Sequence, residues 1–205
     1  MARLEDITAA GSHKNAEILK ENPDVIRLTF KYGNERDAMG VYLCGKLANI
    51  LFPEVMPKLL GIGKDDTGKF YIDAERVALD ALHLEAQADL NMPKKAARRF
   101  REEHNSHEKV YYKRRAGNES SRMEEITRNF EDAGLPFDAH PYNWTLAENK
   151  VRNIDFKSAW MDPYNRTKRH FNEQKIRKAI LRLEPDQRSA AKSILDELLA
   201  LDSKK

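Results

Sequence analysis

Alternating apolar and polar residues predict that residues 4–31 form β-strands. The clearest strand is Val25–Lys31, which is rich in β-branched and aromatic residues. A shorter apolar segment, Glu17–Lys20, precedes it, and Asn22–Asp24 has the composition of a turn between the two. Ala10–Asn15 is predicted to be a turn between two strands and contains a single glycine.

The spacing of apolar residues changes to that of a helix after residue 34. Asn34 is an expected N-cap, and Asp37, three residues later, takes the place of the glutamate in a capping box. The helix is predicted over Glu35–Phe52, and the prolines at 53 and 57 end it.

Two further strands complete the expected N-terminal part. A strand begins within Met56–Gly63, Asp65–Gly68 is a hairpin turn, and Lys69–Ala74 is the return strand. The first 75 residues are therefore predicted to run strand–strand–strand–helix–strand–strand.

From Arg76 onward the pattern is mostly helical. The elements expected are helices over 76–90 and 93–104, a loop over 105–119, a helix from Ser120 or Ser121 through Phe130 that Gly134 ends, strands over 144–147 and 150–155, and two C-terminal helices divided by Pro185–Asp186.

Composition limits the class of protein. The 205 residues are enough for one domain or for two small lobes that share a cleft. We expect no membrane association, because the sequence has no apolar run long enough to cross a bilayer and no apolar core of a signal peptide at its start. The single cysteine, Cys44, excludes an internal disulfide and a cysteine zinc cluster, so a reducing cytoplasm is the expected location.

Positive charge is concentrated between residues 94 and 115. This segment has nine Lys or Arg residues against three Glu, whereas the net charge of the whole chain is only +3. It fits a patch for nucleic acid or for an acidic partner, and it equally fits the solvated face of a helix.

The residues with the most chemical meaning lie between 137 and 156. Asp138 is followed five residues later by Asn143, and Asp155 comes twelve residues after that, at the end of a short apolar segment. An aspartate that orients a hydroxyl, with an amide oxygen and a carboxylate that hold Mg²⁺, is the equipment of phosphoryl transfer.

The order of these elements and motifs along the chain resembles that of the protein-kinase-like superfamily. The resemblance is closest to its small, divergent branches, such as aminoglycoside and choline kinases and compact bacterial and phage protein kinases. Their catalytic loop often reads D-x-H-x-x-N, which Asp138–Asn143 matches, and Val151–Phe156 matches the strand that presents the metal-binding aspartate. The resemblance implies an α+β, bilobal fold, with a β-rich N-lobe over 1–75 and a helical C-lobe over 76–205 that contains the hairpin 137–156.

The resemblance also implies an ATP- and Mg²⁺-dependent kinase that transfers phosphate to a hydroxyl. Asp138 would orient the hydroxyl, and Asn143 and Asp155 would hold Mg²⁺. A protein serine or threonine is favoured over a small molecule as acceptor, because no acidic cluster is evident that would capture a polycationic small substrate. The implied nucleotide-binding residues are Lys31 on the α- and β-phosphates, Gly11, Ser12 and His13 in the loop over the phosphates, and Glu75 in the segment that binds adenine.

Three positions depart from the family pattern. The phosphate loop has one glycine where the family has several, and Lys157 follows the Asp-Phe pair where a glycine is usual. Residues 46–51, where the family would place the glutamate that pairs with the lysine, contain no acid. These departures leave open a kinase-like binding module without activity, and the basic segment leaves open a nucleic-acid-associated protein.

Overall fold

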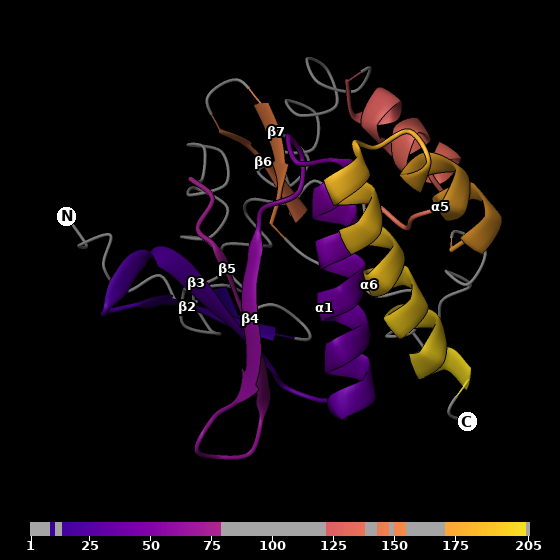
Figure 1. Ribbon diagram of the computed structural model, residues 1–205. Helices are drawn as coiled ribbons and strands as arrows, with labels where there is room; N and C mark the ends of the chain where they lie inside the picture. The colour runs from indigo at the N-terminus through magenta and orange to yellow at the C-terminus, as the bar shows by residue number, and fades with distance from the viewer. Residues whose placement is uncertain are drawn as a thin grey trace, which may run out of the picture.

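A computed structural model of the chain describes residues 9–10, 14–78, 122–137, 143–147, 150–154 and 171–203. These residues form a mixed α+β structure (Figure 1). Its elements are β1 (Ala9–Ala10), β2 (Lys14–Leu19), β3 (Asn22–Phe30), α1 (Glu35–Leu51), β4 (Leu59–Lys64), β5 (Phe70–Glu75), a helix over 122–132, β6 (Trp144–Ala147), β7 (Lys150–Asn153), α5 (Glu173–Ile180) and α6 (Pro185–Ser203).

The first five strands form one antiparallel sheet in the order β1-β2-β3-β5-β4. The helix α1 connects β3 to β4 and begins as its sequence predicts. Asn34 accepts a hydrogen bond from the Asp37 N–H, and Asp37 accepts one from the Asn34 N–H. The predicted order strand–strand–strand–helix–strand–strand is confirmed.

The helix α1 is the middle layer of the structure. It lies between the sheet and α6, with the C-terminal helix on the side away from the strands (Figure 1). Buried residues of β3, β5, α1 and α6 belong to one continuous core, and Cys44 is buried within it as a small core residue. The C-terminal helices are therefore joined through their side chains to the first 75 residues.

The outer face of the sheet is polar and ordered by one ion pair. The guanidinium of Arg27 on β3 donates two hydrogen bonds of 2.8 Å to the carboxylate of its cross-strand neighbour Asp73 on β5. The ring of Tyr71 lies 3.8 Å from the Arg27 guanidinium carbon. The hydrogen bond to Asp73 raises the pKa of Arg27 above its ordinary value, so the guanidinium stays charged.

A second, smaller core lies beneath the β6–β7 hairpin. Trp144 and Val151 of the hairpin pack with Met123 of the 122–132 helix. That helix ends at Gly134, whose φ of +77° is the left-handed conformation expected of a glycine that closes a helix. Trp144 is a core residue, since only 2% of it is exposed.

Two predicted turns near the start of the chain are wrong in extent. Lys14 and Asn15 were placed in a turn, but they begin β2 and pair with Phe30 and Thr29. Asn22–Asp24 was also placed in a turn, but these residues begin β3, and the turn lies at residues 20–21. Proline is tolerated near the first residue of a strand, where its missing N–H leaves no ladder position empty.

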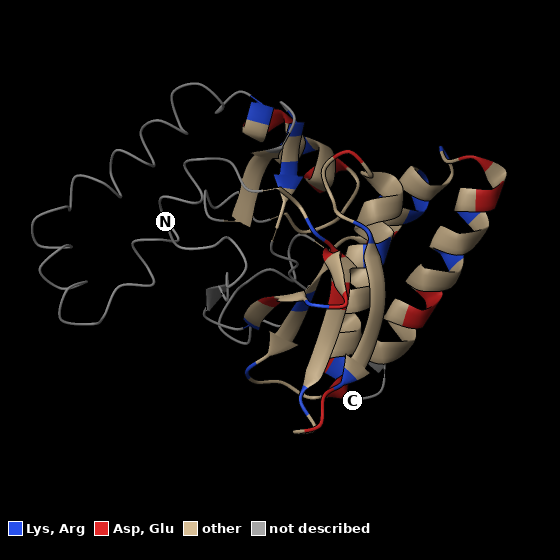
Figure 2. Cartoon of the chain, turned by 90° about the vertical axis from the view of Figure 1, so that its left-hand side faces the viewer, with Lys and Arg blue, Asp and Glu red and all other residues tan. Residues whose placement is uncertain are grey.

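The other predicted elements agree with the structure to within a few residues, where it describes them. Residues 76–78, expected to begin a helix, are irregular. The predicted helices after residue 78, the loop at 105–119 and the basic segment 94–115 lie outside the described residues. In the described part, Lys and Arg are intermingled with Asp and Glu along the elements (Figure 2). None of the described helices is long and apolar enough to cross a bilayer.

Candidate functional site

The register of the β6–β7 hairpin determines the position of Asn143. In the hairpin, Trp144 pairs with Asn153. One residue further from the turn, the Ile154 N–H donates a hydrogen bond of 2.8 Å to the Asn143 carbonyl. Asn143 therefore lies opposite Ile154, the residue directly before Asp155.

The chain is also anchored directly before Asp138. The Phe137 ring packs against Phe130, with ring centroids 4.6 Å apart, and Phe130 stacks on Phe52 at 4.1 Å. Phe52 is the C-cap of α1. Phe137 is thus packed, through Phe130, on the end of α1.

A backbone hydrogen bond ties the hairpin to the segment that follows α1. The Asn153 N–H donates to the Val55 carbonyl over 2.8 Å. Asn153, on the face of Trp144 and Val151, is 2% exposed, and Thr145, on the opposite face, is fully buried. The hairpin is therefore fixed to the fold by its main chain as well as by its apolar core.

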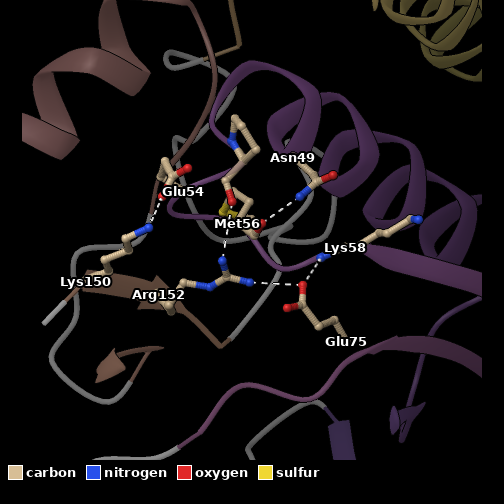
Figure 3. A network of polar contacts seen from close by, with 8 residues as sticks. Asn49, Glu54, Met56, Lys58, Glu75, Lys150 and Arg152 are labelled. Atoms are coloured by element: carbon tan, nitrogen blue, oxygen red, sulfur yellow. Dashed lines mark hydrogen bonds and ion pairs between the residues drawn. The ribbon is translucent and has the colours of Figure 1, made fainter. Parts of the chain in front are cut away.

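Two ion pairs add to this attachment (Figure 3). Arg152 Nη2 lies 3.0 Å from Glu75 Oε2, which also accepts a hydrogen bond of 3.1 Å from the Lys58 N–H. Lys150 Nζ lies 2.8 Å from Glu54 Oε2, and this hydrogen bond lowers the pKa of Glu54. The segment 53–58 is consequently held from both the β5 end and the hairpin.

The predicted adenine-binding residue, Glu75, is engaged within the fold. Its N–H donates to the Lys58 carbonyl, and the next N–H, that of Arg76, donates to the Asp24 carbonyl, each over 2.8 Å. Its carboxylate accepts hydrogen bonds from the Arg152 side chain and from the Lys58 N–H. Both hydrogen bonds are to Oε2, so Glu75 helps to attach the hairpin at the end of β5.

Lys31 follows directly after Phe30, the last residue of β3, and is half-buried. Helix α1 offers it no acid in its middle, because the only acids of this helix are Glu35 and Asp37 in the first turn. Glu35 lies 3.8 Å from Lys64, and Asp37 completes the capping box.

The remaining predicted site residues are not described. Asp138, Asp155 and the phosphate loop of Gly11, Ser12 and His13 lie outside the described residues. Within the described ranges, no three His, Cys, Asp or Glu side chains come together as metal ligands.

Sequence reasoning missed the attachment of the hairpin. Arg152 and Glu75 are 77 positions apart, and Lys150 and Glu54 are 96 apart. The alternation that predicts the strand Lys150–Asp155 puts these two cations on it, but nothing in the sequence selects their partners among 33 acids.

No family model matches the chain, and no curated protein shows a significant match to it.

Proposed function

We propose that the protein is an ATP- and Mg²⁺-dependent phosphotransferase of the protein-kinase-like class that acts on a hydroxyl group. The observation that carries this proposal is the hairpin register, which sets Asn143 opposite the residue before Asp155. An amide oxygen and a carboxylate at neighbouring positions are a donor set that suits Mg²⁺.

The order of the N-terminal elements supports the same proposal. Protein kinases carry their nucleotide-contacting lysine on the third strand of this part, followed by a helix that packs on the sheet. Here a third strand ends at Phe30, is followed by Lys31, and leads into α1. The bilobal arrangement of the kinase-like fold is part of the proposal.

In this proposal Asp138 accepts and orients the hydroxyl that attacks the γ-phosphate. Its place in the chain, directly after the packed ring of Phe137, supports a fixed position for the start of the catalytic loop. Asn143 and Asp155 would hold Mg²⁺, which neutralises charge on the phosphates when bound. Catalysis then depends on positioning and on charge stabilisation more than on proton transfer.

The proposed acceptor is a protein serine or threonine in the reducing cytoplasm. A protein with acidic segments would suit the basic residues 94–115, which lie outside the described residues. If that segment instead binds nucleic acid, binding to duplex DNA should weaken steeply with salt and be indifferent to Asp155→Ala.

The test is transfer of label from γ-³²P-ATP with and without Mg²⁺. Labelling of the protein itself or of an added protein acceptor should need Mg²⁺ and should be lost in Asp138→Asn. The matched control is Asp66→Asn, which makes the same change at an exposed position in the β4–β5 turn and should label like wild type. Equal labelling by wild type and Asp138→Asn would contradict the enzyme proposal.

A kinase-like module that binds nucleotide without turnover is the second candidate. The observation that favours it is the placement of both α1 acids in the first turn, which leaves the middle of that helix without a carboxylate. Stabilisation of the fold by ATP and Mg²⁺, with no labelling under any condition, would select this candidate.

A further inference from the structure

The two faces of the sheet can be assigned from the strand register. Ala16, Leu28 and Ile72 are cross-strand neighbours on β2, β3 and β5, and all three belong to the core on the α1 side or pack against it. Because side chains alternate along a strand, residues two positions away point to the same face. Lys14 is two residues before Ala16 and therefore lies on the α1 side of the sheet.

The contact of Lys14 agrees with this assignment. Its cross-strand partner is Phe30, which is 3% exposed and part of the core. Lys14 Nζ lies 5.7 Å from the centroid of the Phe30 ring, within the range of a cation–π contact. A positive charge is thus held at the end of the sheet, on the inner face, by an aromatic ring.

Lys31 has a different relation to the sheet. The residues of β3 that alternate with Leu28 and Phe30 are Arg27 and Thr29, and Arg27 makes its ion pair with Asp73 on the outer face. The alternation of β3, carried one step beyond its end, assigns Lys31 to the face of Arg27 and Thr29. In the described strands, the inner face at this end of the sheet carries Lys14 on β2 and Lys64 on β4, and Lys64 lies 3.8 Å from Glu35 of α1.

Lys14 is also adjacent to the predicted phosphate loop. Ala10 on β1 pairs with Asn15 on β2, and Lys14 directly follows Gly11, Ser12 and His13 in the sequence. A lysine ammonium binds phosphate as a point charge and needs only to lie near it. No other residue of β2 on the inner face is charged, since Ala16 and Ile18 follow it there.

We propose that Lys14, rather than Lys31, contacts the phosphates of bound ATP, with Phe30 as the positioning residue that holds its side chain. This inference rests on the proposed function, because it needs a nucleotide beneath the sheet.

The experiment compares Lys14→Met with Lys31→Met by calorimetric titration with ATP and Mg²⁺, and then with adenosine. We expect Lys14→Met to weaken ATP binding about tenfold or more, as for the loss of one charge-assisted contact, and Lys31→Met to change it less than about threefold. Adenosine has no phosphate, so its affinity should be the same in wild type and Lys14→Met. A merely structural role of Lys14 would weaken both ligands alike.

The charge-conserving variant and the positioning residue complete the design. Lys14→Arg should recover most of the ATP affinity that Lys14→Met loses, and Phe30→Leu should weaken ATP more than adenosine. If Lys31→Met weakens ATP binding as much as Lys14→Met or more, or if Lys14→Met affects ATP and adenosine equally, the assignment to Lys14 is wrong while nucleotide binding stands. If the wild type binds neither ligand, the proposed function itself fails.

Discussion

The ion pair between Arg152 and Glu75 should contribute measurably to stability, whereas the neighbouring pair of Lys150 and Glu54 should contribute little. Both pairs attach the β6–β7 hairpin to the rest of the fold, and their N–O distances are similar, 3.0 and 2.8 Å. They differ in exposure. The Arg152 side chain is 18% exposed and that of Glu75 49%, against 57% for Lys150 and 72% for Glu54.

The expected coupling energies of the two ion pairs follow from their difference in exposure. An exposed pair gains about 0.2–1 kcal/mol at most, because water screens it and two long side chains must be ordered. A hydrogen bond to a charged group contributes a net stabilisation of roughly 1.5–3 kcal/mol, and less where a partner is exposed to water. Since Glu75 remains half-exposed, we expect a coupling energy of about 1 kcal/mol for Arg152–Glu75. For the exposed pair Lys150–Glu54 we expect a coupling energy well below that of Arg152–Glu75.

The assay is a pair of double-mutant cycles in urea. One cycle uses Arg152→Met, Glu75→Gln and the double variant, because methionine keeps much of the apolar stem of arginine and removes the charge. The control cycle uses Lys150→Met, Glu54→Gln and their double variant. At about 1 kcal/mol, Arg152→Met should also lower the melting temperature by roughly 2–4 °C.

Salt separates the two pairs further. The coupling of the exposed pair should vanish in 1 M NaCl, where the Debye length is about 3 Å, and that of Arg152–Glu75 should partly survive. The reasoning would be refuted if the two cycles gave equal couplings, or if the Arg152–Glu75 coupling vanished in the same salt as the control.

Two further predictions concern turns. Gly134→Ala should destabilise the protein by at least about 1 kcal/mol more than Gly68→Ala, as measured by urea unfolding. Both glycines have positive φ, which strains other residues by about 1–2 kcal/mol. Of the two, only Gly134 would bring an added Cβ against backbone, 2.5 Å from the Asn172 carbonyl oxygen. Equal losses would contradict this. The Asp65 carboxylate accepts a hydrogen bond from the Thr67 hydroxyl, and this bond lowers the pKa of Asp65. The destabilisation caused by Asp65→Ala should therefore be present at pH 7 and shrink as the pH falls below about 4. A destabilisation that does not change with pH would contradict this prediction.

Features set by neighbouring residues could be predicted from the sequence. Asn34 and Asp37 are three positions apart and satisfy each other's backbone N–H groups, so the start of α1 needs no distant partner. The positive φ of Gly134 follows from its place after a helix. The β6–β7 hairpin was also predicted within two residues, because alternation and a short turn determine it locally.

Features set by distant partners could not be predicted in the same way. Lys14 and Asn15 are polar and follow a glycine, so their composition favours a turn, but pairing with Phe30 and Thr29 places them in β2. The partner of Arg152 depends on where β5 ends relative to the hairpin, which no local pattern contains. The sequence therefore predicted locally determined elements better than it predicted the distant contacts that hold them together.

The attachment of the hairpin bears on how the proposed site would work. The β5 end, where adenine binding is predicted, and the hairpin, where the metal ligands are predicted, are joined directly by Arg152 and Glu75. They are joined a second time through the segment 53–58, because the Val55 carbonyl accepts from the Asn153 N–H and the Lys58 N–H donates to Glu75. A nucleotide that reached from one end to the other would meet two groups whose separation is fixed before it binds. Such preorganisation lowers the cost of ordering the site, and in a fold with a reduced glycine loop it would compensate for backbone contacts that the loop does not provide.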